Sequence, residues 1–250
     1  MMTQVKTAEE IVNMRESGRM TAHILDLLRR NIQVGMSTQQ LDDMVAEELK
    51  ALGAKAAFLG YQGFPAHICI SINEEAVHGL PSPKRIIQDG DVVGLDFGVT
   101  YNGMITDSAI TVQVGTQDKA SQRFLATIEQ ALSRAIAVVR PGVRVGDIGA
   151  AAEQTIESAG YKVILSLTGH GVGHTVHEDP SIPNFGTPGT GMALKEGMTI
   201  AIEPIASLTS DDVVLAPDGW TYSSADGSLS GQFEHTVLIT RDGAEILTML

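Results

Sequence analysis

The chain has 250 residues, 43% of them hydrophobic and 19% charged, which is typical of a globular protein rather than a disordered one. No apolar run approaches the roughly 20 residues of a membrane-spanning helix, and the opening MMTQVKTAEEIVNM lacks the apolar segment of a signal peptide. The net charge of −13 argues against a nucleic-acid partner, which needs a basic surface. We therefore expect a cytoplasmic protein with no membrane or nucleic-acid partner.

Two helices are predicted in the N-terminal region. Residues 8–31 carry apolar side chains at helical spacing. Ser37 and Gln40 match a capping box for a second helix, which stops at Gly53. The pattern then predicts a strand-rich region at 67–114, helical segments at 118–139 and 146–159, and strands at 161–166, 197–206 and 232–248.

The chain resembles itself at an offset of 107 residues. The matches are Gly35 with Gly142, Leu41 with Ile148, Leu49 with Ile156, and Gly53 with Gly160. This favours two duplicated α/β halves, about 8–115 and 116–250, that share one sheet around a pseudo-two-fold axis. Chance similarity between two helix–turn–helix patterns is the alternative. Because no Ser/Pro/Gly-rich linker separates the halves, we expect residues 1–250 to form a single domain.

A β-hairpin is predicted at 91–114, because the Asn-Gly pair at 102–103 is a strong turn signal. A two-residue loop pairs Gly98 with Asp107 and puts Asp96 on the same face, diagonally adjacent and about 7–8 Å away at Cα. Two facing carboxylates repel each other unless a cation or a proton lies between them. Solvent exposure is the alternative, but this face otherwise carries glycine and alanine, which favours a shared cation.

Two further acids, Glu203 in MTIAIEPI and Glu234 in QFEHTVLIT, lie in apolar strand-like runs. Buried acids are rare unless they are paired or bind metal, and basic residues are scarce beside both. Four carboxylates and one histidine would balance two divalent cations, and this mostly oxygen donor set suits Mn, Fe or Co, with Zn less distinctive. Two such ions can lower the pKa of a bridging water, which is the physical case for metal-assisted hydrolysis.

The segment GHGVGHTVHEDP offers His170 and His177 as candidate site histidines, and strand alternation does not choose between them. Glycine next to His170 allows close approach to a metal, whereas His177 lies beside acids. His78, in a turn-like setting, is as compatible with a surface position as with function. The remaining histidines are expected to be structural or exposed: His23, His67, His174 and His235. Cys69, the single cysteine, excludes an internal disulfide and is expected to line a core or pocket.

Together these pieces resemble the type I methionine aminopeptidases of bacteria over nearly the whole chain. The matching motifs are GYQGFPAHICISINEEAVHGLP, DGDVVGLDFGVTYNG, TDSA, GHGVGHTVHEDP, LKEGMTIAIEPI and DGWTYSSADGSLSGQFEHT. As an ordered set they are highly specific. The resemblance implies the pita-bread α/β fold, in which two pseudo-symmetric halves share a curved, mainly antiparallel sheet with helices on its outer face.

The resemblance also implies roles for individual residues. The implied ligands of the two metal ions are Asp96, Asp107, His170, Glu203 and Glu234. Catalysis would involve His78, His177 and Glu203, and His78 and His177 would also contact the substrate. The implied methionine pocket is lined by Tyr61, Phe64, Cys69 and Trp220. Phe58 and Val176 depart from the pattern near this pocket and put its shape in doubt.

The implied reaction removes an N-terminal methionine from a nascent peptide when the next residue is small. A metal-bridging hydroxide would attack the scissile carbonyl, while Glu203 handles the proton and His177 donates toward the carbonyl oxygen. His78 would contact the scissile amide nitrogen or the backbone of the second residue. We expect a monomer that makes transient contact with the ribosome through its catalytic domain.

Two other functions compete with this one. An aminopeptidase P or prolidase would use the same fold, but usually with an additional N-terminal domain. A non-enzymatic peptide- or nucleic-acid-binding module on this fold would be expected to lose metal ligands, whereas this chain keeps the full implied set. The enzyme interpretation is therefore favoured.

Overall fold

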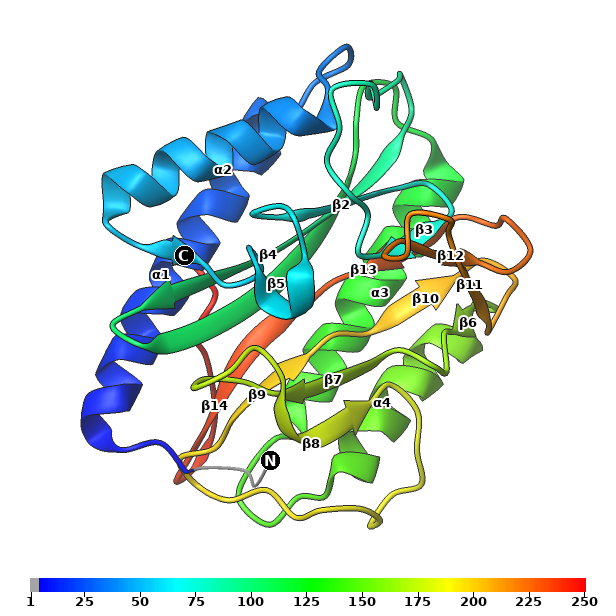
Figure 1. The fold of residues 1–250 in the computed structure, drawn as a ribbon. Coiled ribbons are helices and arrows are strands. Elements are labelled where there is room, and N and C mark those ends of the chain that lie inside the picture. Colours follow the sequence, from blue (N-terminus) through cyan, green and yellow to red (C-terminus); the bar gives the residue numbers. More distant parts are fainter. Residues whose placement is uncertain (1–4) are drawn as a thin grey trace.

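The computed structural model describes residues 5–250 as a mixed α/β protein (Figure 1). The helices are α1 (Ala8–Asn31), α2 (Thr38–Leu52), α3 (Lys119–Ala137) and α4 (Val145–Ser158), with a short 3₁₀ helix at Tyr61–Gly63. The strands of the first half are β1 (Lys55–Ala56), β2 (Cys69–Ile72), β3 (Glu75–Val77), β4 (Val92–Tyr101) and β5 (Met104–Gln113). Those of the second half are β6 (Lys162–Val163), β7 (Thr168–Gly171), β8 (Glu178–Pro183), β9 (Thr199–Ile202), β10 (Ile205–Ser207), β11 (Val213–Leu215), β12 (Tyr222–Ser224), β13 (Ser230–Gln232), β14 (His235–Thr240) and β15 (Gly243–Ile246).

All four predicted helices are present, with ends within two residues of the predicted ones, and local capping explains where α1 and α2 begin. The Ser37 side chain accepts from the Gln40 backbone N–H while the Gln40 side chain accepts from the Ser37 N–H, which is the predicted capping box of α2. Gly53 ends that helix in the left-handed region, with φ of 67°. A second capping box, between Thr7 and Glu10, begins α1.

The strand pairings are antiparallel, as the predicted fold class requires. In the four-stranded sheet, β4 pairs with β5 along one edge and with β1 and β2 along the other. The second half contains a five-stranded sheet of order β15-β14-β9-β7-β8. Two three-stranded sheets, β13-β10-β6 and β11-β12-β3, complete the set.

The two larger sheets meet where β5 approaches the chain just before and within β14. Thr236 Oγ1 accepts from the Asp107 N–H at 2.8 Å and donates to the Asp107 carbonyl at 2.7 Å. The backbones of Ala109 and Glu234 also exchange hydrogen bonds. This junction brings the predicted ligands of the two halves next to each other.

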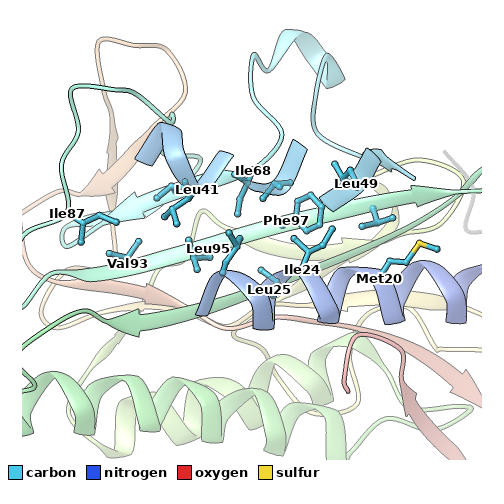
Figure 2. Packing of buried hydrophobic residues seen from close by; sticks show 14 of the residues in the cluster. Met20, Ile24, Leu25, Leu41, Leu49, Ile68, Ile87, Val93, Leu95 and Phe97 are labelled. Atoms are coloured by element: carbon cyan, nitrogen blue, oxygen red, sulfur yellow. The ribbon is translucent and has the colours of Figure 1, made fainter. Parts of the chain in front are cut away.

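The helices flank the sheets in two pairs, with α1 and α2 beside β4 and β5, and α3 and α4 beside strands of the second half (Figure 1). In the first half, Leu25 and Leu41 from the helices pack on Leu95 and Phe97 of β4, all almost fully buried (Figure 2). Burial of such side chains contributes about 1.5–3 kcal/mol each. This core fixes β4 from behind and leaves its other face for the site.

The short strands of the second half were predicted less completely. The strands β7, β8, β11 and β12 fall outside the predicted strand ranges. Glycine and proline interrupt the apolar alternation in β7 (TGHG) and β8 (EDPSIP), so neither has a strand signal of its own. The helices α2 and α4 begin 107 residues apart, at Thr38 and Val145, and the division into domains stays a prediction. Within residues 5–250, no helix is both long and apolar enough to cross a membrane.

Candidate active site

One cavity of about 450 Å³ gathers every residue that the sequence and its resemblance single out. Its lining includes Tyr61, Phe64, Cys69, His78, Asp96, Asp107, His170, His177, Glu203, Trp220 and Glu234. Phe58 and Val176 line the same cavity, as expected for residues that shape the pocket. The described structure therefore assembles the predicted site in one place, and the role of each residue stays a prediction.

The hairpin supplies two carboxylates in the predicted register. Gly98 pairs with Asp107 and Asp96 pairs with Ala109 across β4 and β5. Gly98 is closely packed, because a Cβ there would lie 3.0 Å from the Ala57 Cβ and its neighbours would have to move slightly. Asp107 therefore lies opposite Gly98 and diagonally next to Asp96 on the same face, and the charges of the two aspartates interact.

Three strands of the second half supply the other candidate donors. His170 on β7 pairs with Ala201 of β9, Glu203 follows the end of β9, and Glu234 precedes β14. His170 Nε2 lies 3.4 Å from Glu203 Oε1. His170 Nδ1 lies 2.9 Å from the Gly171 carbonyl, which can only accept, so Nδ1 carries the proton and the Nε2 lone pair is available to a cation.

Unpartnered donor atoms indicate that these residues fit a divalent cation. Asp107, His170 and Glu234 each place one potential ligand atom within 4.8 Å of the others. Among the described residues, Asp96 Oδ1, Asp107 Oδ1 and Glu234 Oε1 are buried without a hydrogen-bond partner. Buried carboxylate oxygens without partners are costly, and a cation is the group that satisfies several at once.

The electrostatics of the carboxylates point the same way. Burial raises the pKa of Asp96 to about 7, although hydrogen bonding with Gln232 and Asp107 opposes the rise. Burial, followed by the negative charge of the neighbouring carboxylates, raises the pKa values of Asp107, Glu203 and Glu234 well above their usual range. Without a cation this set retains protons to a higher pH than ordinary carboxyl groups do, whereas a bound cation would favour their release.

Two further histidines face the same cavity in neutral form. Burial, and to a smaller extent the charge of His177, lowers the pKa of His78 to about 4. Burial also lowers the pKa of His177. The hydroxyl of Tyr61 lies 3.0 Å from His177 Nδ1, and the rings of His177 and His170 make an edge contact with centroids 4.3 Å apart.

Aromatic side chains form the apolar wall of the cavity. Phe64 makes an edge contact with Trp220, with ring centroids 5.2 Å apart, and a second one with Phe58 at 6.4 Å. Cys69 is 4% exposed, and burial followed by the nearby carboxylates raises the pKa of its thiol well above the usual value. The thiol is therefore an apolar wall element rather than a nucleophile.

The glycines beside His170 serve a purpose different from the predicted one. A Cβ at Gly169 would lie 2.3 Å from the Ala201 carbonyl oxygen, and one at Gly171 would lie 2.2 Å from that of Asp179. Their contacts are with the neighbouring strand backbones, so glycine is needed here for strand approach. The pairing of β7 with β8 is also irregular between these two glycines, which explains why alternation could not select His170.

Gln232 is a site residue that the sequence analysis missed. Its Nε2 donates to Glu203 Oε2 at 3.1 Å, and it also bonds Asp96. Its position in the sequence, two residues before Glu234, was a signal that could have identified Gln232. The four histidines expected to be structural or exposed all have polar partners outside the donor set, namely Glu48 for His23, Asp42 for His67, Glu10 for His174 and Thr248 for His235.

Comparisons with known proteins agree with this geometry. Residues 12–241 match the model of metallopeptidase family M24. A methionine aminopeptidase of Mycoplasma capricolum is 43% identical over 99% of this chain and 98% of its own length. The crystal structure of a methionine aminopeptidase from Thermotoga maritima superposes over the whole of both chains with a TM-score of 0.98 and 43% identity. The prolidase of Pyrococcus furiosus shares the fold at a TM-score of 0.81 and 27% identity, but this chain covers only 65% of it.

A cavity of buried carboxylates and histidines on this fold is that of a metal-dependent peptidase, and the pita-bread architecture is confirmed. The chain belongs to metallopeptidase family M24, among its methionine aminopeptidases. It is accordingly an enzyme that depends on divalent metal.

Proposed function

We propose that this enzyme removes the N-terminal methionine from nascent proteins and peptides whose second residue is small. One observation carries the proposal, namely that four carboxylates, the His170 imidazole, two further neutral histidines and an aromatic wall converge on a single cavity. The full-length similarity to methionine aminopeptidases supports it.

Two divalent ions would be held by Asp96, Asp107, His170, Glu203 and Glu234, with four carboxylates offsetting their charge. Bound there, they supply an activated water and positive charge for the substrate carbonyl. Co, Mn, Fe and Zn all suit the donor set. The orphaned oxygens of Asp96, Asp107 and Glu234 support this assignment.

The side chains of the chain itself perform the remaining steps. Glu203, which lines the cavity, takes up the proton released by the attacking water and passes it to the leaving amine as the scissile C–N bond breaks. With Tyr61 donating to its Nδ1, neutral His177 keeps a proton on Nε2, and this N–H donates a hydrogen bond toward the carbonyl oxygen as negative charge develops there. His78 contacts the scissile amide or the next backbone unit. The methionine side chain lies against Tyr61, Phe64, Cys69 and Trp220.

The proposed setting is the cytoplasm, where a monomer would meet nascent N-termini with transient contact to the ribosome. Neither nucleic acid nor membrane is a proposed partner, in line with the acidic net charge of −13.

The test is hydrolysis of Met-Ala-Ser and Xaa-Pro-Ala peptides by metal-stripped protein, before and after addition of Mn, Fe, Co or Zn. We expect methionine release from the first peptide only, and only with metal, and the most effective ion ranks the cofactors. A matched Met-Leu-Ser peptide tests the requirement for a small second residue. Cleavage of the proline peptide alone would assign the chain to the prolidase branch, and folded protein inactive with every ion would favour a binding module.

A further inference from the structure

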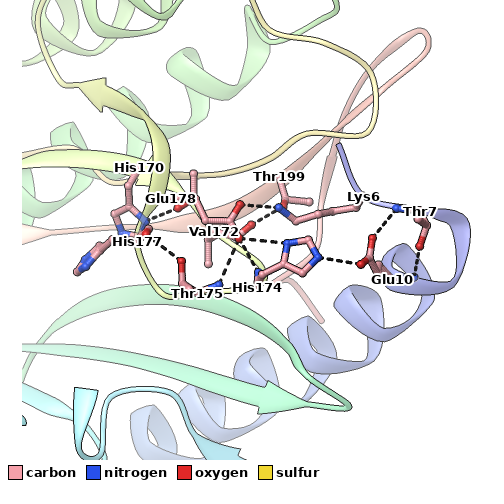
Figure 3. Close-up of polar contacts among 11 residues, drawn as sticks. Lys6, Thr7, Glu10, His170, Val172, His174, Thr175, His177, Glu178 and Thr199 are labelled. Carbon is pink, nitrogen blue, oxygen red and sulfur yellow. Dashed lines mark hydrogen bonds and ion pairs between the residues drawn. The ribbon is translucent and has the colours of Figure 1, made fainter. Parts of the chain in front are cut away.

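A buried ion pair ties the N-terminal segment to the loop that carries His177 (Figure 3). Lys6 precedes α1, and Glu178 directly follows His177. Lys6 Nζ donates to Glu178 Oε2 at 2.7 Å, and the two side chains are only 1% and 5% exposed. Burying both charges costs desolvation energy, which the contact offsets only when its geometry is well fixed.

The second oxygen of Glu178 holds the loop itself. Glu178 Oε1 accepts from the backbone N–H groups of His174 at 2.5 Å and Thr175 at 3.2 Å. The Thr175 hydroxyl in turn donates to the His177 carbonyl at 2.9 Å. The backbone around His177 is therefore organised by a single carboxylate.

The first turn of α1 reaches the same loop through His174. The His174 Nε2 lies 2.8 Å from Glu10 Oε1, and the His174 Nδ1 lies 3.4 Å from Glu178 Oε1. The other oxygen of Glu10 accepts from the Thr7 N–H in the capping box of α1. Glu10 thereby couples the start of the helix to the histidine loop.

Lys6 is held in place by its backbone as well as by its side chain. Its N–H donates to the Gly197 carbonyl at 2.8 Å. A Cβ at Gly173 would lie 2.2 Å from Lys6 Cε, so glycine at this position leaves space for the lysine. The Gly173 carbonyl accepts from the Ile105 N–H on β5, which joins the segment around Lys6 to the hairpin.

We propose that Lys6 and Glu178 are positioning residues for His177. They fix the loop so that the His177 ring meets the Tyr61 hydroxyl and packs edge-on against His170. The expected catalytic consequence rests on the function proposed above, whereas the orientation of the ring does not. A displacement of about 1 Å at a reacting group can cost roughly 100-fold in rate.

The first test is Lys6→Met, which keeps the length of the side chain and removes its charge. We expect kcat on Met-Ala-Ser to fall about 10- to 100-fold with KM within about threefold of the parent. Calorimetric metal affinity should stay within about twofold, because the partner of the Lys6 ammonium is Glu178, which is not one of the proposed ligands. In the metal-free variant the ring ¹⁵N signals of His177 should shift while those of His67 should not.

A double variant separates positioning from stability. Lys6→Met with Glu178→Leu removes both buried charges, so the melting temperature should recover toward that of the parent. Its kcat should stay low, because the carboxylate that held the loop N–H groups is gone. Recovery of kcat together with the melting temperature would overturn the proposal.

The matched control is Arg15→Met, which breaks the Arg15–Glu245 pair, an exposed ion pair that also joins α1 to the second half. It should change neither kcat nor the His177 signals. Unchanged kcat or unchanged His177 signals in folded Lys6→Met would overturn the proposal. If that variant does not fold, Glu178→Gln replaces it and is judged by the same His177 signals. Failure of the parent enzyme to release methionine would reject the proposed function, and the His177 signals would still decide this inference.

Discussion

The two halves of the molecule bring donors to the same cavity by different routes. In the first half, one hairpin with continuous pairing from Val92–Gln113 to Tyr101–Met104 presents Asp96 and Asp107 on one face. In the second half, His170, Glu203 and Glu234 come from β7, β9 and β14 or their ends, and each position depends on tertiary pairing. The first arrangement is local and the second is not, so the two should respond differently to perturbation.

The largest expected effect comes from a variant that tests whether the donors of the two halves act as one metal site. Asp107→Asn keeps the shape of the side chain and removes a charge that the proposed cations require. We expect kcat/KM on Met-Ala-Ser to fall about 10³-fold or more. The metal-free variant should melt higher than the metal-free parent above neutral pH, because a buried like-charge repulsion is gone.

Glu234→Gln, in the other half, should reproduce both effects, and Asp43→Asn, at an exposed position on α2, should reproduce neither. Calorimetry measures the loss of metal affinity, and thermal melting measures the stability of the metal-free variants. If Asp107→Asn abolished binding while Glu234→Gln left it intact, the hairpin alone would hold the metal, and the comparison between the halves would fail.

The same contrast explains how much the sequence could predict. The hairpin register and the capping boxes depend on residues close in the chain, so periodicity and turn chemistry were enough to predict them. The choice of His170 came only from family resemblance, because the irregular pairing beside it removes the alternation signal. The contact between Lys6 and Glu178 joins residues 172 positions apart, and no local pattern encodes it.

A pair of glycine variants should separate local from tertiary control. Gly169→Ala places a Cβ 2.3 Å from the Ala201 carbonyl oxygen and 3.2 Å from the Ile182 Cβ, so β7 must move away from β9 or β8. We expect a loss of about 2–3 kcal/mol, or roughly 4–12 °C in melting temperature, with weaker metal binding.

Gly103→Ala, in the hairpin turn, meets no atom within 4 Å and suffers only from its φ of +79°. It should cost about 1–2 kcal/mol and leave metal affinity unchanged, because the strand pairing holds the aspartates. Equal losses of metal affinity in the two variants would show that the turn, and not the strand pairing, maintains the carboxylate geometry.

The smallest expected effect is the pH dependence of the metal-free protein. Burial raises the pKa of Asp96 from 3.8 to about 7, and those of Asp107, Glu203 and Glu234 well above their usual range. A raised pKa in the folded state gives stability that is present at low pH and lost as the pH rises through the folded value. His78 and His170 contribute to stability in the opposite sense, because burial lowers their pKa values from 6.5 to about 4 and about 3.

These signs predict that the metal-free protein loses stability as the pH rises above 6.5, the ordinary pKa of histidine. Between about pH 4.5 and that value, the four carboxylates and the four histidines with lowered pKa values (His78, His170, His177 and His235) act in opposite directions, so their effects on the free energy of unfolding largely offset one another. Above that pH only the carboxylates respond, and the melting temperature should fall by a few degrees, roughly, as the pH rises to about 8. Saturating divalent ion should remove this alkaline decline, because it stabilises the deprotonated carboxylates of the folded state by mass action. Asp107→Asn should make the dependence of melting temperature on pH shallower in the metal-free protein. A decline of the same size with metal bound, together with no change in Asp107→Asn, would place the source of the decline outside the donor set.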